Sequence, residues 1–460
     1  MRKSLLACTA FMALQLAGPP NAFNDLGAAS FPVLGGIAYA KAPATGVAVV
    51  STVSELKEAV ADPTVDEVRV RGVLEFDAED SLMIGRSVVI RGDEPDGATV
   101  IGGTWTFRVF APGSDVVISD IHFEDCERGA ILAGLVENLT IENNVITADN
   151  GRSVTYQNPY DELIAWGMLI GYSSYPQGLT GDIVIRGNFV DLELDPNSEA
   201  FFPTWANPDD PFSRPLLGWQ GDPPPPPPEY YITIGIDVRQ AVNNVVIKGN
   251  HVRNGTGRGI LCLDWYDTTT ITIKDNLVEA DAYGGYHFGS RGYSSYGIFA
   301  FNPFNGTGSG GYLTIKDNDI RMEQVNHVGI GVGNRNAKPN GASIKGNRIH
   351  VTNGYLAIVN YENDDFEIKG NTITGSAYFG IAIDGLAIAG QGADRNVVKG
   401  NDMAGFVPKA TDDYLELRLE APYSAHVLLT DETHYNEVLI GAGEVVVDQA
   451  DPSTNEVRTE

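Results

Sequence analysis

A histidine, an arginine and a tyrosine lie close together within the 460-residue sequence, as His287, Arg291 and Tyr293. Histidine can accept a proton near neutral pH, tyrosine can donate one, and arginine can neutralise a carboxylate. β-Elimination of a uronic acid requires these side-chain types, because the proton that is removed lies beside the uronate carboxylate. We predict His287 as the base, Tyr293 as the acid and Arg291, Arg239 or Arg258 as the neutralising group.

Glycoside hydrolysis is the alternative chemistry, and it needs two carboxylates about 5 to 9.5 Å apart. Asp237 and Asp264 form the best such pair if they lie on consecutive units of the repeat described below. Both alternatives use the same part of the chain, since Arg239 follows Asp237 closely and Arg258 precedes Asp264.

Aromatic residues are frequent in the same part of the sequence. Aromatic rings beside hydrogen-bonding groups can stack on sugar faces, although each ring could instead fasten a loop to the fold. The side chains that we expect to contact a polymer are Tyr156, Tyr160, Trp166, Tyr286, Phe301, Tyr361 and Asp384.

The elements that must position these residues are repeated. An Ile-x-x-Asn motif inside an alternating apolar segment recurs mostly every 24 to 30 residues, with longer intervals where segments are inserted. Counted with a first copy that ends its motif at Asp120, the copies are VVISDIHF (116–123), LTIENNVI (139–146), IVIRGNFV (183–190), VVIKGNHV (245–252), ITIKDNLV (271–278), LTIKDNDI (313–320), ASIKGNRI (342–349), FEIKGNTI (366–373) and NVVKGNDM (396–403).

A second phrase follows the motif in most units, as in RGILCLD (258–264) and FGIAIDG (379–385). Each unit then has three short strands and cannot bury its own apolar face. Stacking like strands about 4.8 Å apart closes a continuous core. The sequence therefore predicts an all-β fold, a right-handed single-stranded parallel β-helix.

Alternation along the second phrase predicts which side chains face the core. The inward set is Ile236, Val238, Ile260, Cys262, Ile330, Val332, Ile381 and Ile383. The outward set is Asp237, Arg239, Leu261, Leu263, Phe299, Phe301, Tyr361 and Asp384.

The motif asparagines should lie over one another. An Asn at a turn can adopt the left-handed conformation and can hydrogen-bond to the next copy along a stack. The predicted ladder is Asn144, Asn188, Asn250, Asn276, Asn318, Asn347, Asn371 and Asn401, and the neighbouring lysines are expected to solvate the turns.

The ends of such a coil need covering. Thr52 and Glu55 have the spacing of a capping box at the start of an amphipathic segment with Val53, Leu56 and Val60, which predicts a helix that closes the N-terminal end. Residues 436–449 predict a last pair of strands. We expect one domain over 47–450 and a polar tail over 451–460.

Three insertions precede the second phrase, at 147–166, 191–231 and 279–296. All three fall at the same corner of the unit, so we expect them to form one wall beside the outward side of these strands. A walled groove along a coil suits a long polymer.

The N-terminal part of the coil resembles known proteins. VDEVRVRGVLEF (65–76), SVVIRGDEPDGATVIGG (87–103) and VFAPGSDVVISDIHFED (109–125) are similar to the opening of the pectin lyase-like superfamily of right-handed parallel β-helix proteins. That superfamily contains lyases, hydrolases, epimerases, phage tailspikes and adhesins, so the resemblance implies the fold rather than one activity. The sequence lacks the polygalacturonase signatures and the Asp-Pro-His-Asp of alginate epimerases. A polysaccharide lyase, a glycoside hydrolase and a non-catalytic glycan-binding or surface adhesion protein remain the alternatives.

The chain is acidic, with 31 Lys and Arg against 60 Asp and Glu and a formal net charge of −29. Such a field repels polyanions at long range, and we expect no nucleic-acid partner. An acidic polysaccharide would need the local Arg groups or Ca²⁺ to reverse that field. Residues 361–367 could bind Ca²⁺, with a solvated turn as the alternative. We expect a monomer.

The N-terminus predicts export. Arg2 and Lys3 precede a short apolar stretch that is typical of a signal peptide, with cleavage after Ala22 or after Ala40. A lipid anchor at Cys8 is the alternative to a secreted or periplasmic protein. No later apolar run is long enough to cross a membrane. Cys126 and Cys262 are expected to be buried free thiols.

Overall fold

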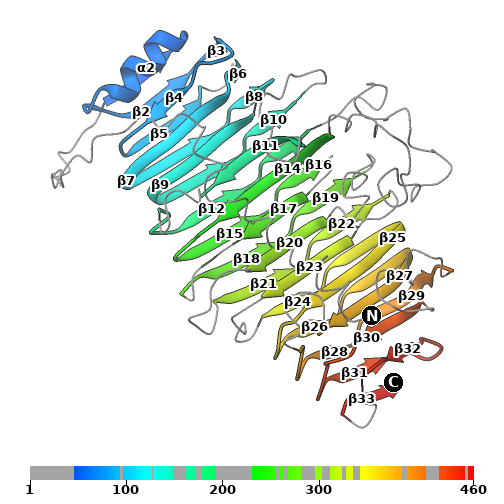
Figure 1. Ribbon diagram of the computed structural model, residues 1–460. Helices are drawn as coiled ribbons and strands as arrows, with labels where there is room; N and C mark the ends of the chain where they lie inside the picture. Colours follow the sequence, from blue (N-terminus) through cyan, green and yellow to red (C-terminus); the bar gives the residue numbers. More distant parts are fainter. Residues whose placement is uncertain are drawn as a thin grey trace, which may run out of the picture.

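The computed structural model describes residues 46–93, 97–126, 128–148, 162–171, 178–192, 230–253, 258–263, 265, 268–280, 296–302, 311–323, 328–334, 342–385, 392–410, 424–450 and 454–459. These residues form a right-handed parallel β-helix, as predicted, and every strand pairing among them is parallel (Figure 1). The coil has three faces, which we call the first face, the second face and the GI face.

The first face contains the strands that carry the Ile-x-x-Asn motif and the strands that continue the same stack at both ends. They are β1 (Gly46–Val50), β2 (Val65–Val70), β5 (Val88–Gly92), the later parts of β7 (Trp105–Ser119) and β9 (Gly129–Glu142), β12 (Ile183–Arg186), β15 (Asn244–Lys248), β18 (Thr270–Lys274), β21 (Tyr312–Lys316), β24 (Ser343–Lys345), β26 (Glu367–Lys369), β28 (Val397–Lys399), β31 (Glu437–Ile440) and β33 (Glu456–Thr459).

The second face follows the turn after each motif. Its strands are β3 (Gly72–Phe76), β6 (Ala98–Gly102), β8 (His122–Glu124), β10 (Val145–Thr147), β13 (Phe189–Asp191), β16 (His251–Arg253), β19 (Leu277–Ala280), β22 (Asp319–Met322), the first parts of β25 (Arg348–Tyr361) and β27 (Thr372–Asp384), and β29 (Asp402–Pro408).

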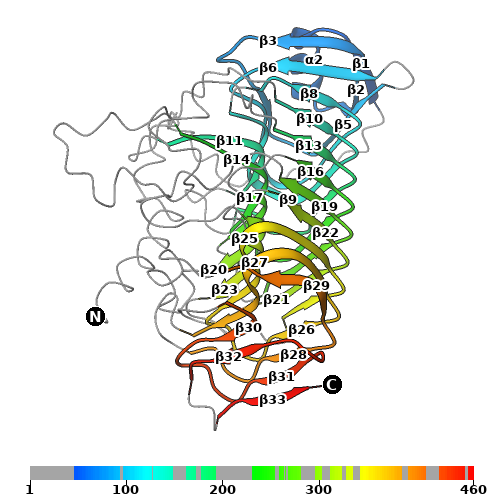
Figure 2. The same cartoon turned by 90° about the vertical axis from the view of Figure 1, so that its right-hand side faces the viewer.

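The GI face contains the strands of the second phrase. They are β4 (Leu82–Ile84), the first parts of β7 and β9, β11 (Glu162–Ile170), β14 (Tyr230–Arg239), β17 (Arg258–Leu263), β20 (Tyr296–Asn302), β23 (Val328–Asn334), the last parts of β25 and β27, β30 (Ala425–Leu429) and β32 (Val446–Asp448). Figure 2, turned by 90°, shows the successive coils stacked along one axis.

One hydrophobic core runs through the inside of the coil. The inward set predicted for the GI strands is confirmed, because all eight side chains belong to this core and are at most 2% exposed. Burying one Val, Leu or Ile side chain contributes about 1.5–3 kcal/mol, so a core repeated at every coil stabilises the whole stack.

The predicted asparagine ladder is also confirmed. From Asn144 to Asn401, the side-chain oxygen of each Asn accepts from the backbone N–H and the side-chain amide of the preceding Asn at 2.9–3.0 Å. The same amide also donates to a motif carbonyl of the preceding coil, as Asn276 does to Ile247 at 3.0 Å. Each buried Asn therefore satisfies donors and acceptors that a closed turn would leave unpaired.

Two details of the predicted ladder were wrong. The left-handed residue is the one before the ladder Asn, for example Gly249 (φ 64°) or Asp275 (φ 55°), and not the Asn itself. The first motif copy is also shifted by one residue, because the backbone N–H of Ile121, and not of Asp120, donates to the Asn144 side chain at 3.2 Å. Gly and Asp tolerate this conformation, which leaves the Asn extended enough to reach the next coil.

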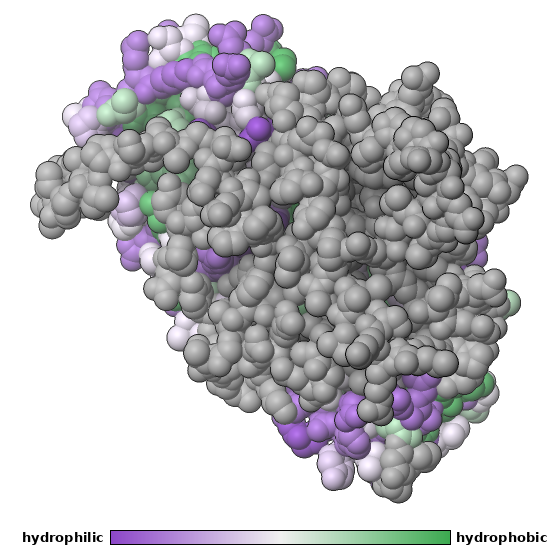
Figure 3. Space-filling view, viewed as in Figure 1, coloured by the Kyte–Doolittle hydropathy of each residue, from purple (hydrophilic) through white to green (hydrophobic). Residues whose placement is uncertain are grey.

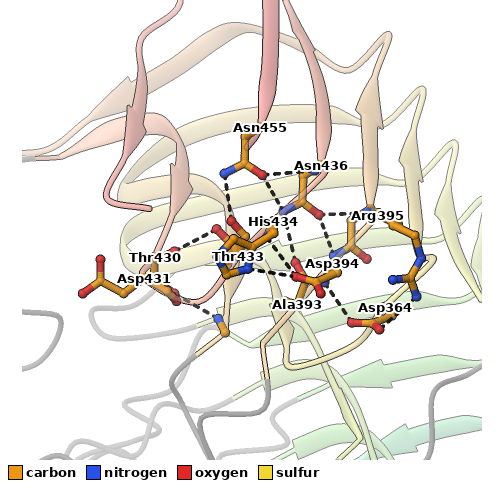
Figure 4. A network of polar contacts seen from close by, with 12 residues as sticks. Asp364, Ala393, Asp394, Arg395, Thr430, Asp431, Thr433, His434, Asn436 and Asn455 are labelled. Atoms are coloured by element: carbon orange, nitrogen blue, oxygen red, sulfur yellow. Dashed lines mark hydrogen bonds and ion pairs between the residues drawn. The ribbon is translucent and has the colours of Figure 1, made fainter. Parts of the chain in front are cut away.

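A second asparagine ladder lies near the C-terminal end, and the motif did not predict it. Asn396, Asn436 and Asn455 repeat the same bonding at the start of the first-face strands, with distances of 2.8–3.1 Å. Figure 4 shows Asn436 and Asn455. Asn360 joins this ladder from inside the coil, where its amide donates to Asn396 at 3.2 Å. The lower coils are therefore held by asparagines at two corners.

A column of small residues explains the Gly of the second phrase. At Gly259, an added Cβ would lie 2.5 Å from a methyl group of Val278 and 2.6 Å from the Gly297 carbonyl oxygen. Gly235 and Gly297 face the same restriction on adjacent coils. Gly at this position lets the GI face approach the second face, which closes the coil.

The N-terminal helix is confirmed as α2 (Val53–Ala61). The Thr52 hydroxyl accepts from the Glu55 N–H at 3.2 Å, and the Glu55 carboxylate accepts from the Ser51 N–H at 2.8 Å. Leu56 and Val60 are buried against the first coil. At the other end, β31 and β32 are the predicted strand pair, and β33 adds a further strand within the segment that we expected to be a polar tail.

Candidate functional site

The three long insertions connect the same two faces. One lies between the end of β10 at Thr147 and the start of β11 at Glu162, the next between β13 and β14, and the third between β19 and β20. Each therefore leaves the second face and enters the GI face. The GI strands β11, β14, β17 and β20 are successive neighbours in the sheet, and we consider their outward side the candidate site.

Several predicted site residues lie outside the described residues. They are His287, Arg291, Tyr293, Asp264, Tyr156, Tyr160 and Tyr286. Where described residues form the surface in the view of Figure 3, they lie mainly at the two ends of the coil, and hydrophilic side chains predominate there.

The described members of the predicted outward set point away from the core but are not exposed. Phe301 is 1% exposed, Tyr361 7%, Asp384 7% and Asp237 0%. The apolar members belong to a second hydrophobic cluster, separate from the coil interior, in which the Phe299 and Phe301 rings stack 5.4 Å apart. The expectation that these side chains line an open groove is therefore corrected, because they are buried and their rings pack on one another.

Asp237 and Arg239 form a buried ion pair at the centre of this region. The Arg239 Nε lies 2.9 and 3.0 Å from the two Asp237 carboxylate oxygens, and Nη2 donates to Oδ2 at 2.7 Å. Trp166 Nε1 donates to the same Oδ2 at 3.0 Å from the preceding coil. The structure thus brings together three predicted site residues, and it occupies the Asp237 carboxylate with charge-assisted hydrogen bonds.

The thiol of Cys262 lies on the inward side of the neighbouring strand. Burial, reinforced by the Asp237 charge, raises the pKa of Cys262 far above its usual range. The thiol therefore stays protonated and unreactive. Cys126 and Cys262 are both buried and free, as predicted.

Arg258 rests on aromatic rings. Its guanidinium carbon lies 4.6 Å from the centre of the Tyr296 ring and 5.2 Å from that of Phe299, and the residue is only 6% exposed. These distances allow cation–π attraction to a desolvated charge. Tyr296 therefore holds a predicted site residue in place.

A tyrosine pair continues the same cluster. The hydroxyls of Tyr296 and Tyr361 are 3.0 Å apart. Burial, followed by the influence of Tyr296, raises the pKa of Tyr361 well above its usual range. Tyr361 therefore stays neutral. On a later coil Asp384 accepts from the Thr430 hydroxyl at 3.1 Å.

In the acidic segment 361–367, an arginine from a later coil binds two of the acids. Arg395 donates to Asp364 at 3.0 Å and to Asp365 at 2.8 Å, and Asp364 is 1% exposed. Figure 4 shows Asp364 and Arg395 close to the second ladder. Among the described residues no group of three or more His, Cys, Asp or Glu side chains could hold a metal ion.

The helical part of the described chain contains no segment long and apolar enough to span a membrane.

No model of a known protein family matches the sequence, and no curated relative matches it. Similar solved structures include the A-module of the mannuronan C-5 epimerase AlgE4 of Azotobacter vinelandii, with 10% identity, a TM-score of 0.41, and coverage of 90% of this chain and 96% of that one. DFA-IIIase of Arthrobacter chlorophenolicus A6 has 14% identity and a TM-score of 0.38, over 85% and 88%.

A third similar structure is tailspike protein 3 of bacteriophage CBA120, with 10% identity and a TM-score of 0.33, over 88% of this chain and 58% of that one. All three similarities extend along most of this chain. The function proposed below is argued from this chain's own residues.

Proposed function

We propose that the protein acts on an extracellular acidic polysaccharide along the outward side of the GI face, by β-elimination. The observation that supports this proposal is that three insertions lead into one run of neighbouring GI strands, β11 to β20, and that this run also carries Trp166, Asp237, Arg239 and Arg258. Long insertions at one corner of a repeated scaffold are typical of a binding site.

The structure changes the roles that we assign to the arginines. Arg239 is bound to Asp237, and Arg258 is stacked on Tyr296. Both are placed to stiffen the strands rather than to contact a substrate. We therefore assign neutralisation of the uronate to Arg291, with His287 as base and Tyr293 as acid, and we assign Asp237, Arg239 and Arg258 as positioning residues.

The hydrolase alternative requires Asp237 to reach a glycosidic bond. A general acid must lie within hydrogen-bonding distance of the leaving oxygen. Asp237 is completely buried, and Arg239 and Trp166 occupy its carboxylate. This arrangement argues against Asp237 as a catalytic acid.

Binding without catalysis is the second candidate function. It is favoured by one observation, which is that the described ionisable groups of the GI face are bound to one another rather than displayed. Such a face supports a binding surface without supplying chemistry of its own.

An assay on purified protein separates these functions. Alginate, pectin, glycosaminoglycan and neutral glycans would be incubated with the protein, with and without Ca²⁺. A lyase produces unsaturated ends that absorb in the ultraviolet, a hydrolase produces reducing ends without that absorbance, and a binding protein retains the polymer unchanged. We expect ultraviolet absorbance from one uronate polymer, and hydrolysis or retention alone would contradict the lyase proposal.

Substitution sharpens the assay. We expect His287→Ala to reduce turnover by about 100-fold or more, because general base catalysis typically contributes that much. His122→Ala is the matched control, since His122 lies on the second face and bonds to Thr147 at 2.8 Å. Equal activity of both variants would remove His287 from the mechanism.

We also propose that the protein is exported to the periplasm or the medium as a monomer. Residues 1–45, which carry the predicted signal, lie outside the described residues. N-terminal sequencing of the exported protein would distinguish cleavage after Ala22 from cleavage after Ala40. Labelling at Cys8 by a fatty acid would instead support a lipid anchor.

A further inference from the structure

A row of basic side chains runs along the first face, away from the GI face. Each first-face strand from β12 to β28 ends in one basic residue, and the strand register places each beside the next. The basic row consists of Arg186, Lys248, Lys274, Lys316, Lys345, Lys369 and Lys399. These strands follow one another down one side of the coil in Figure 1.

The basic row is accessible and only partly neutralised. All seven residues are exposed or half-exposed. Ion pairs hold its ends, where Arg186 contacts Glu142, and Glu367 lies 2.5 Å from Lys345 and 3.6 Å from Lys399.

The middle of the row has no such partner. Among the described residues, no carboxylate oxygen lies within 4.0 Å of the ammonium nitrogens of Lys248, Lys274 or Lys316. Asp275 and Asp317 are the nearest acids in sequence, and they occupy the turn that follows Lys274 and Lys316.

The side chains beside the basic row complete a strip over its upper coils, and the exposed acids Asp182, Asp275 and Asp317 lie only at the margins of this strip. The residues two positions before the first four cations of the row are half-buried, and they are Val184, Val246, Thr272 and Thr314. Tyr312, on the same side of its strand, is 58% exposed. The strip therefore offers cations, hydroxyls and one free aromatic ring, which are the groups that bind an acidic sugar.

The fold does not require cations at these positions. The ladder Asn and the left-handed residue before it form the turn, and a Ser or Thr at the row would be solvated equally well. Like charges directly opposite each other on neighbouring strands destabilise a sheet. A row of like charges in a protein with a net charge of −29 therefore indicates a ligand that compensates the repulsion.

The spacing of the row selects the kind of ligand. Neighbouring strands are about 4.8 Å apart, so the cations recur at about that interval along the axis. A sugar ring with its glycosidic bond has a similar length, and a uronate polymer carries one carboxylate on each ring. Duplex nucleic acid fits less well, because its phosphates recur every ~3.4 Å of axis on each strand and wind around that axis.

We propose that the basic row is a binding surface for a linear acidic polysaccharide that carries one carboxylate per sugar and lies along the coil axis. The local cations act within about 10 Å at 0.1 M salt, whereas the net charge repels the polymer from further away. Binding is therefore salt-sensitive. The proposal shares its polymer class with the function proposed for the GI face but none of its residues, so the two can fail separately.

The test compares two triple variants of the full-length protein that remove the same charge. Lys248→Thr, Lys274→Thr and Lys316→Thr remove the middle of the row. Arg253→Thr, Arg321→Thr and Arg348→Thr remove three cations from the second face, on the coils of Lys248, Lys316 and Lys345. Titration calorimetry with sodium alginate chains, at low and at physiological salt, measures binding, and circular dichroism confirms folding.

We expect the unaltered protein to bind alginate more weakly as salt is raised and not to bind dextran. The row variant should lose about tenfold or more in affinity and the second-face variant less than about twofold. Both variants lose three positive charges, but only the row variant loses cations without a carboxylate partner along the proposed path of the polymer. Equal affinity of the two variants would overturn the proposal, as would tighter binding of DNA than of alginate or no binding of alginate by the unaltered protein. His287→Ala should bind at the row unchanged, which separates this result from failure of turnover.

Discussion

The first face and the GI face belong to the same coils, yet their outward sides differ. On the first face one residue type recurs at equivalent positions, as the basic row does. On the GI face equivalent positions hold Leu169, Asp237, Leu261 and Phe299 on successive strands. Outward side chains that repeat from coil to coil suit a ligand with a repeating structure. Outward side chains that differ from coil to coil suit a single site with its own geometry.

The largest expected effect comes from the GI face. Asp237→Ala removes the partner of Arg239, whose side chain is only 14% exposed, and should cost about 3–5 kcal/mol of unfolding free energy, because a buried charge is left unpaired. Denaturant unfolding would measure this loss of unfolding free energy. The double variant with Arg239→Ala should recover part of the loss. A cost below about 1 kcal/mol for Asp237→Ala would mean that the pair does not hold the GI face together.

The ladder corner should come next, because both faces depend on it. Asn276→Ala deletes the acceptor for the two Asn250 N–H groups and the donor to the Ile247 carbonyl, and all of these groups are buried. The substitution should lower the free energy of unfolding by about 2–4 kcal/mol. Asn244→Ala is the matched control, since its amide makes an exposed bond to Asp182 at 2.9 Å. Similar unfolding midpoints for the two variants would contradict the importance of the ladder.

The third prediction compares a glycine in the closely packed column of Gly235, Gly259 and Gly297 with a glycine at an open surface. Gly259→Ala should destabilise the protein by about 1–3 kcal/mol, because the new methyl group would overlap Val278 and the Gly297 carbonyl. Gly85→Ala serves as control, since its Cβ would meet only the Phe110 carbonyl oxygen at 3.9 Å. Thermal unfolding that shifts equally in both variants would show that the column is not tightly packed.

The smallest effect is expected on the first face and depends on pH. Hydrogen bonding and charge from Lys345, with smaller contributions from Lys399 and Lys369, lower the pKa of Glu367 below its usual 4.5. A lowered pKa in the folded state means that the carboxylate stabilises the fold above about pH 4.5 and loses this effect as pH falls through the lower, folded-state pKa. Glu367→Gln should therefore be slightly less stable than the unaltered protein at pH 7 and equal to it near pH 3. A difference that grows as pH falls would have the wrong sign.

Repetition made most of the fold predictable. The strand order, the inward side chains and the ladder from Asn144 to Asn401 follow from one motif that recurs at nearly constant spacing. The helix at Val53–Ala61 follows from local capping residues. These features depend on neighbouring residues or on copies of one another, which a single sequence displays directly.

The features that were missed depend on contacts without a repeated signal. Asn396, Asn436 and Asn455 are 40 and 19 residues apart, and the Asn-x-Val sequence that each begins is too short to stand out as a repeat. Arg395 reaches Asp365 from 30 residues away, so the acidic turn gave no sign of its partner.

Burial outside the core was also missed. Alternation shows the direction of a side chain such as Phe301 but not whether another layer covers it. The available signal was the group of aromatic and aliphatic residues at the outward positions of β17 and β20, and we had interpreted Phe301 in this group as part of a sugar-binding surface.

Turnover and binding of one uronate polymer, measured side by side, test most directly whether the two faces have different tasks. The account predicts that His287→Ala loses the ultraviolet-absorbing product while it keeps its affinity for the polymer at low salt. It predicts that the triple substitution at Lys248, Lys274 and Lys316 loses affinity while turnover at saturating polymer persists. Loss of turnover and of affinity together in both variants would contradict the assignment of separate tasks to the two faces.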